Sequence, residues 1–132
     1  MSPNFAYATY SQNNISIESP EKLITMLYEG ILKFSAHAKR AIEKRDLEKK
    51  SYWINRSIAI YIELLNSLDY KEGNVAHYLS GLYVHQIKML SEANIENDTN
   101  KIDTVLHVTK ELLVARSEST RLNSSHVAIS YA

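Results

Sequence analysis

The sequence contains no cysteine, two prolines and three glycines in 132 residues. Without cysteine the chain has no disulfide framework, no thiolate metal site and no cysteine nucleophile. Strands joined by tight turns use more glycine and proline than this, so the composition favours helices. The mass of 15.1 kDa corresponds to one domain, and a domain of this size folds without cross-links.

Net charge and long apolar runs are absent as well. Fifteen Lys and Arg residues balance fifteen Asp and Glu residues, so the chain lacks the cationic character of a typical nucleic-acid-binding protein. No stretch approaches the roughly 20 apolar residues of a membrane span, and the N-terminus does not resemble a signal peptide. We therefore expect a cytoplasmic protein with no membrane insertion and no nucleic-acid partner.

Apolar residues recur at helical spacing in four stretches between residues 20 and 115. Ser19-Pro20-Glu21 is typical of a helix start, with a capping hydroxyl, a proline in the first turn and an early acidic residue. Asp46 predicts the start of a second helix, residues 69–73 a turn before a third, and Asp98 the start of a fourth.

These patterns predict an all-α fold, an antiparallel up-down four-helix bundle over residues 20–115. Residues 1–19 lack helical periodicity and are interpreted as an extended N-terminal arm. The predicted core contains six apolar residues from the helical stripes: Leu27, Ile31, Ile58, Leu65, Leu82 and Leu106.

Residues 116–132 differ from the rest of the chain because they have no helical stripe, and 127–131 favour a strand. The string also matches the translation of a common short-read sequencing adapter. Its triplets AGC ACA CGT CTG AAC TCC AGT CAC encode residues 119–126. We interpret residues 116–132 as a non-native tail. The alternative is a native irregular tail.

The sequence offers no recognisable catalytic or metal-binding motif. A di-iron bundle needs Glu-x-x-His pairs, and none occurs here. His77 and His85 lie about 12 Å apart along one helix, too far to share a metal, and His37 and His107 have charged neighbours. We predict that the protein is not an enzyme and binds neither a metal nor a cofactor.

Tyrosine is the informative excess, since eight of the nine tyrosines precede residue 116. A tyrosine ring combines an apolar face with a polar tip, which suits binding surfaces. The alternative is that the helical tyrosines are ordinary half-buried residues at the bundle edges. Tyr7 and Tyr10 lie in the arm, where we expect them to dock onto the bundle or contact a partner.

Several segments resemble the flagellar secretion chaperone family FliS. They are YATYSQN at residues 7–13, SPEKLI at 19–24, MLYEG at 26–30 and ELLNSLDYKEG at 63–73. The resemblance covers residues 5–115, and its specificity comes from the order and spacing of the segments. Two positions depart from the family pattern: Asn74 stands where a second glycine is usual, and Arg116 where a tryptophan is usual.

The resemblance implies a cytosolic export chaperone without ATPase activity. Its client would be the disordered C-terminal segment of flagellin, which it would keep from polymerising prematurely and help deliver to the flagellar type III export gate. A disordered amphipathic client can lay short helices into apolar grooves of a bundle. We assign flagellin binding to arm and stripe residues: Tyr7, Tyr10, Tyr28, Ile58, Tyr61, Leu65, Tyr83 and Ile87.

Two alternatives remain open from the residues alone. One is a helical-bundle adaptor or regulatory protein with another partner, and the other is a metal or cofactor bundle. A pull-down with and without the flagellin C-terminal segment separates the first from the chaperone, and a metal analysis tests the second.

Overall fold

The structure is a computed structural model that describes residues 19–131, apart from the side chains of residue 72 and residues 119–131. The described residues form four α-helices and a short 3-10 helix, in the order α2 (Pro20–Glu43), α3 (Leu47–Asn66), η1 (Tyr70–Glu72), α4 (Asn74–Glu96) and α5 (Thr99–Tyr131). The all-α prediction is confirmed. The predicted extended arm, with Tyr7 and Tyr10, lies outside the described residues.

The helices begin where the sequence predicts them. The Ser19 hydroxyl accepts a hydrogen bond from the Lys22 amide at 3.2 Å, and the Asp46 carboxylate accepts one from the Lys49 amide at 3.1 Å. Both side chains satisfy amides that have no partner inside the helix. Gly73, with φ of 94°, turns the chain into α4 in a conformation that favours glycine.

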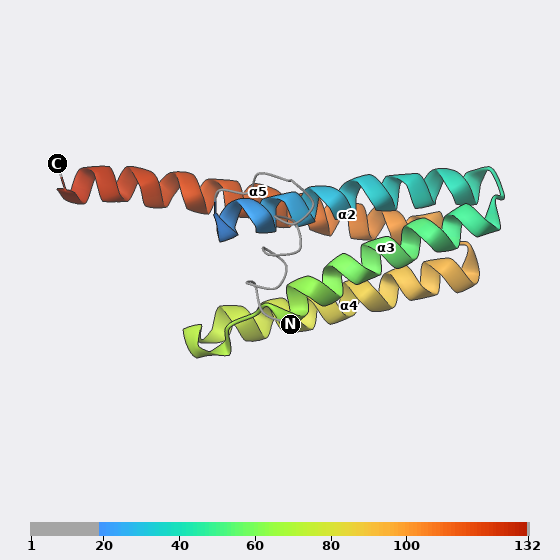
Figure 1. The fold of residues 1–132 in the computed structure, drawn as a ribbon, viewed down its shortest axis with the longest axis horizontal. Coiled ribbons are helices and arrows are strands. Elements are labelled where there is room, and N and C mark those ends of the chain that lie inside the picture. Colours follow the sequence, from blue (N-terminus) through green and yellow to red (C-terminus); the bar gives the residue numbers. More distant parts are fainter. Residues whose placement is uncertain (1–18, 132) are drawn as a thin grey trace.

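The helices run up and down as an antiparallel bundle (Figure 1). Helix α2 packs against α3 and α5, and α4 packs against the same two helices. The α2–α5 and α3–α4 pairs lie close together where the α2–α3 and α4–α5 turns meet, and they diverge toward the other end (Figure 1). We call these the closed end and the open end.

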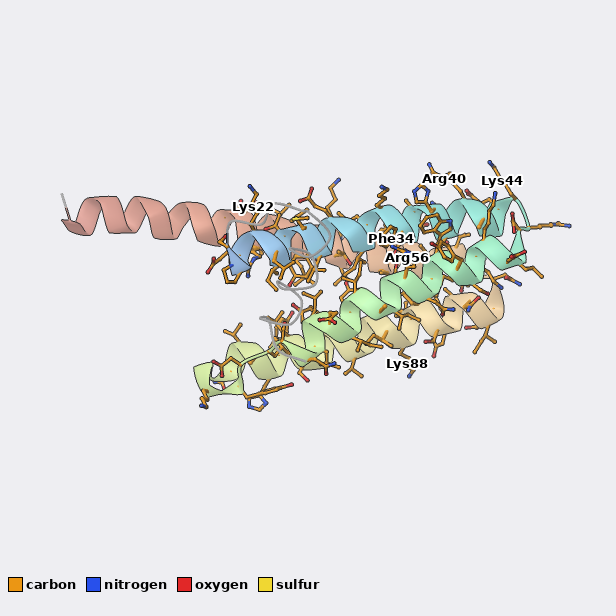
Figure 2. All side chains as sticks on the ribbon, in the orientation of Figure 1. Lys22, Phe34, Arg40, Lys44, Arg56 and Lys88 are labelled. Atoms are coloured by element: carbon orange, nitrogen blue, oxygen red, sulfur yellow. The ribbon has the colours of Figure 1, made fainter. Side chains whose placement is uncertain are left out.

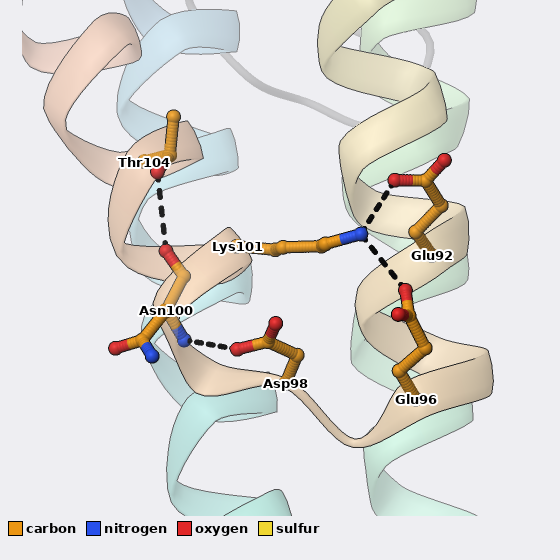
Figure 3. Close-up of polar contacts among 6 residues, drawn as sticks. All are labelled: Glu92, Glu96, Asp98, Asn100, Lys101 and Thr104. Carbon is orange, nitrogen blue, oxygen red and sulfur yellow. Dashed lines mark hydrogen bonds and ion pairs between the residues drawn. The ribbon is translucent and has the colours of Figure 1, made fainter.

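Polar links between helices hold the closed end. The Lys50 ammonium donates to the Asn94 carbonyl at 2.8 Å and to the Asn97 side chain at 2.6 Å, which fixes α3 to the end of α4. Lys101 at the start of α5 contacts the carboxylates of Glu92 and Glu96 at 2.6 and 2.8 Å (Figure 3). These links join α3 to α4 and α4 to α5 near the α4–α5 turn, so this end of the bundle is the constrained one.

The same turn is ordered by short-range hydrogen bonds. The Asn100 amide donates to the Asp98 carboxylate at 2.9 Å, which is the start of α5 that the sequence predicts (Figure 3). The Thr104 hydroxyl donates to the Asn100 carbonyl at 3.1 Å. Asn97 has a φ of 55°, a left-handed conformation that asparagine tolerates and that ends α4.

The core prediction was only partly correct. Leu27 and Ile31 are buried as predicted, whereas Ile58, Leu65, Leu82 and Leu106 are only half-buried. In α3 the innermost positions are Ile54, Tyr61 and Leu64. Ile58 and Leu65 lie on the flank of the same stripe and pack against the core from its edge. The apolar stripe of α3 is wider than the part of the helix that touches its neighbours. Periodicity identifies the apolar face of a helix, but it does not show which residues lie at the middle of that face.

The last helix differs from the sequence prediction. Residues 116–131 continue α5 as a helix to Tyr131, with neither an irregular tail nor a strand. Extending an existing helix adds one hydrogen bond for each residue fixed, and this segment has no glycine or proline to stop it. Figure 1 shows that this part of α5 projects beyond the ends of the other helices.

Candidate functional site

A cleft of about 240 Å³ lies at the open end of the bundle. It is bordered by the first three turns of α2, the last turn of α3 with the residues that follow it, the first half of α4 and one residue of α5. Its lining residues are Pro20, Glu21, Leu23, Ile24, Tyr28, Leu64, Ser67, Leu68, Asp69, Leu79, Tyr83 and Arg116. We call this the open-end cleft. It forms where the two helix pairs diverge.

The walls of the open-end cleft are mainly apolar. Leu23 and Leu64 are buried at its base, and Ile24, Leu68 and Leu79 are half-buried at its sides. Leucine and isoleucine side chains that remain partly exposed in a concave site are suited to receive apolar side chains of a ligand. At about 240 Å³ the cleft is smaller than a usual small-molecule site, which suits single side chains of a ligand.

The apolar character continues outside the cleft along the start of α4. Val75 and Tyr78, one turn apart from each other on that helix, are each 68% exposed. Val75 lies one turn before Leu79 on α4, and Tyr78 is its neighbour in the sequence. Exposed apolar side chains next to an apolar cleft extend the surface that a peptide could cover.

Paired hydroxyl groups form a polar layer beneath the cleft. The Tyr28 and Tyr83 hydroxyls are 2.6 Å apart and hydrogen-bonded, and the Tyr61 hydroxyl is hydrogen-bonded to that of Thr109. The Tyr61 and Tyr83 rings contact each other with centroids 5.6 Å apart. Burial raises the pKa of Tyr28, Tyr61 and Tyr83, so all three remain neutral phenols at physiological pH.

The three helical tyrosines predicted to bind a partner all lie in the interior. Tyr28 is 4% exposed, Tyr83 is 2% exposed and Tyr61 is 0% exposed. Tyr28 and Tyr83 border the open-end cleft from below, so a ligand in the cleft would reach them, whereas Tyr61 lies deeper and is not part of its lining.

The other predicted site residues are not brought together in this cleft. Ile58, Leu65 and Ile87 are half-buried on α3 and α4 and pack against the core outside the lining. Tyr7 and Tyr10 lie outside the described residues. Sequence reasoning did not select Ile24, Leu68 and Leu79 as binding residues. No local signal distinguishes them from core residues, because their partial exposure depends on the divergence of the helices.

Arg116 occupies an unusual position in the cleft. It lies on α5 and is half-buried, and its Nε atom is buried without a hydrogen-bond partner among the described residues. Its positive charge acts on the hydroxyls of Tyr28 and Tyr83. A buried guanidinium nitrogen without a partner is costly, so this position is poorly matched to an arginine.

The open-end cleft contains no nucleophile paired with a base, and no group of three or more potential metal ligands occurs in the described part of the chain. Within residues 19–131, no helix combines the length and apolarity needed to span a bilayer. The cleft can therefore bind apolar side chains, and its residues suggest no covalent chemistry.

Comparison with known proteins identifies relatives over nearly the whole chain. Residues 2–118 match the family described as flagellar protein FliS. The chain is 57% identical over 119 residues to the flagellar secretion chaperone FliS of Campylobacter jejuni, which covers 89% of this chain and 93% of the relative. It is 33% identical over 99 residues to FliS of Bacillus subtilis, covering 75% and 74% of the two chains.

A third relative is the flagellar secretion chaperone FliSB of Pseudomonas aeruginosa, which is 36% identical over 92 residues and covers 69% of this chain and 73% of its own. The family match ends at residue 118, so residues 119–132 lie outside it.

Proposed function

The chain belongs to the FliS family of flagellar proteins, and from this premise we propose that it is a cytoplasmic export chaperone for flagellin. It binds the disordered C-terminal segment of flagellin, prevents premature polymerisation, and helps deliver the client to the flagellar type III export apparatus. The name flagellar secretion chaperone, carried by the relatives at 57%, 33% and 36% identity, supports this assignment. We propose no catalytic step and no cofactor.

The observation that carries the proposal is the apolar open-end cleft, and we propose it as an anchoring point for the client. A disordered segment that folds on binding gains affinity by placing apolar side chains of short helices into such sites. Ile24, Leu68 and Leu79 provide the half-buried walls, and the exposed Val75 and Tyr78 extend the surface. The neutral charge of the chain leaves shape and apolar contact to determine most of the affinity.

The sequence-assigned residues of the helices have two different roles in this proposal. Tyr28 and Tyr83 form the base of the cleft, where their hydrogen bond holds α2 and α4 at a fixed separation. Ile58, Leu65 and Ile87 remain proposed contacts for a client that continues along α3 and α4.

We propose that the N-terminal arm, with Tyr7 and Tyr10, covers the cleft when no client is present. The arm is joined to the bundle at Ser19, and the next residue, Pro20, belongs to the cleft lining. This short connection supports the proposal, because a segment that ends at Ser19 ends next to the cleft lining. The client would then displace the arm, which protects the apolar surface from aggregation at some cost in affinity.

We propose that residues 116–132 are foreign to the parent protein. The partnerless Nε of Arg116 supports this interpretation, and the family match, which still includes residues 116–118, covers none of residues 119–132. In this view α5 continues in the parent protein with a tryptophan at position 116, where a large aromatic side chain would close the cleft next to Tyr28 and Tyr83.

Titration of a flagellin C-terminal peptide into the protein, followed by calorimetry, tests the function. The variant Leu79→Ala removes an apolar wall of the cleft and is expected to weaken binding about tenfold or more. Val84→Ala, on the same helix but outside the cleft and 52% exposed, serves as the matched control and should bind normally. Absence of peptide binding contradicts the function, and equal effects of the two variants contradict the placement of the site.

A further inference from the structure

An aromatic and cationic surface lies at the closed end of the bundle, on α2 and α3. We call it the Trp53 patch, and it consists of Phe34, His37, Arg40, Lys44, Lys49, Tyr52, Trp53 and Arg56. Figure 2 shows Phe34 and Arg56 together where α2 and α3 lie next to each other, with Arg40 and Lys44 farther along α2. The proposed function makes no use of this surface.

The aromatic part of the Trp53 patch is already ordered. The Trp53 ring stacks on Phe34 with centroids 5.4 Å apart, and contacts His37 at 4.6 Å and Tyr52 edge-on at 4.8 Å. The Arg56 guanidinium lies 4.7 Å from the centroid of the Phe34 ring, within the range of a cation–π contact. Rings held by one another in this way lose little conformational entropy when a partner binds.

Three of the four cations of the patch lack carboxylate partners in the described part of the chain, and the fourth, Lys49, pairs with Asp46 at 3.9 Å. Arg40, Lys44 and Arg56 form no ion pair with any residue that the structure describes. Arg40 is instead held by a hydrogen bond of 2.6 Å to the His37 ring, and Arg56 donates to the Tyr52 hydroxyl at 3.2 Å. Their positive charge is therefore available to an outside partner.

A small pocket of about 240 Å³ lies within the patch. It is lined by His37, Arg40, Ala41, Lys44, Asp46, Lys49 and Trp53. Asp46 is the one carboxylate in this lining, and it is already engaged with the amide and the ammonium of Lys49. The pocket thus combines the face of an indole ring with uncompensated positive charge.

We propose that the Trp53 patch is a docking site for an acidic segment of a partner protein. An apolar or aromatic side chain of that segment packs against Trp53, and flanking carboxylates pair with Arg40 and Lys44. Tryptophan, tyrosine and arginine are the residues that dominate binding energy at protein interfaces, and the patch contains all three. Bidentate pairing of an arginine with a carboxylate adds geometric specificity to the charge attraction.

The observations favour a peptide over other anionic ligands. The neutral net charge and the small extent of the cationic surface do not match the phosphate-tracking groove of a nucleic-acid-binding protein. The pocket is also smaller than a usual cofactor site. A surface with a few anchors around a shallow pocket is typical of peptide recognition.

The Trp53 patch and the open-end cleft lie at opposite ends of α2. Ile24 in the cleft and Arg40 in the patch are separated by about 24 Å along the helix, at about 1.5 Å per residue. The acidic partner can therefore bind while the cleft is occupied. This inference goes beyond client binding and stands whether or not the client is flagellin.

Trp53 is the single tryptophan of the chain, so its fluorescence reports on the patch directly. The probe is a capped pentapeptide in which phenylalanine is flanked on each side by aspartate and glutamate. We expect it to change the Trp53 emission, with an affinity that falls as salt concentration rises. The uncharged probe, with asparagine and glutamine in place of the acidic residues, should leave the emission unchanged.

Two double variants of equal net charge test whether binding of the acidic peptide depends on the cations of the Trp53 patch. Arg40→Gln with Lys44→Gln removes the unpaired cations next to Trp53 and should weaken binding about tenfold or more. Lys88→Gln with Lys110→Gln removes two exposed cations on α4 and α5, and should bind normally. Figure 2 shows Lys88 on the far side of the bundle from Arg40.

Three results would overturn the inference. The first is an equal response to the charged and uncharged peptides, and the second is an equal loss in the two double variants. The third is a response to a single-stranded RNA dodecamer without a response to the acidic peptide, because that result identifies a different class of partner. Circular dichroism of each variant verifies that the helices remain folded.

Discussion

Truncating two adjacent leucines of α3 tests the packing that the structure assigns to the bundle. Leu64 is 1% exposed and belongs to the core cluster, whereas Leu65 is half-buried and packs against that cluster from outside. The sequence pattern had placed Leu65 in the core. Because the two residues are adjacent and identical, Leu64→Ala and Leu65→Ala remove the same atoms from two different environments.

The expected magnitudes follow from burial. Leu64→Ala removes buried methyl and methylene groups and leaves a cavity between helices, which typically costs about 2–5 kcal/mol. Leu65→Ala removes atoms that already contact water in part, and the vacated space is open to solvent. Its cost should be about 1–2 kcal/mol, close to the loss of partial apolar burial alone.

Urea unfolding followed by circular dichroism measures both values, provided that the m-values of the variants agree. We expect Leu64→Ala to lower the free energy of unfolding by at least about 1 kcal/mol more than Leu65→Ala does. Equal losses, or a larger loss for Leu65→Ala, would show that the rotation of α3 about its axis is wrong. The open-end cleft would then have a different lining, since Leu64 contributes to it.

Three further outcomes are expected. Deleting residues 1–14 should leave the bundle folded and bind the flagellin peptide equally or more tightly, because a competing contact has been removed; weaker binding together with lower stability in the same assays would mean that the arm seals the core permanently. The hydrogen bond from Lys101 lowers the pKa of the Glu92 carboxyl group. The stability that this contact contributes is therefore fully present above the ordinary glutamate pKa, and it is lost as the pH falls through the lowered pKa. Glu92→Gln should therefore be less stable than the parent at neutral pH, with a difference that shrinks below about pH 4 in acid unfolding curves. Deleting residues 119–132 should leave the melting temperature unchanged, and a lower melting temperature would assign these residues a structural role. The substitution Arg116→Trp should raise the melting temperature, because the indole ring would cover apolar surface at the open end.

The functional site was less accessible to sequence reasoning than the fold was. The excess of tyrosine directed attention to Tyr28 and Tyr83, and both border the open-end cleft, yet each is almost completely buried. An amphipathic residue near the edge of a helical stripe can face either the core or the solvent, and the stripe alone does not decide between them. Leu79 is the opposite case. The sequence pattern places it in the core, and in the structure it is half-buried and forms a wall of the cleft.

The starts of the helices were determined by the sequence itself. Ser19, Asp46 and Asp98 begin helices because their side chains bond to nearby amides, and Gly73 turns the chain because it tolerates a positive φ. These are short-range effects within a few residues, so they can be recognised without knowledge of the fold. The helical periodicity between these signals was sufficient to predict a four-helix bundle.

The tertiary structure decided which part of each stripe is buried and where the bundle opens. Whether Leu64 or Leu65 lies innermost depends on how α3 is rotated against its neighbours, and the cleft depends on the divergence of the two helix pairs. Both are set by the simultaneous packing of residues far apart in the chain, such as Tyr28 with Tyr83 and Lys50 with Asn94. A local pattern contains no information about such distant contacts, and for that reason only the assembled helices define the site.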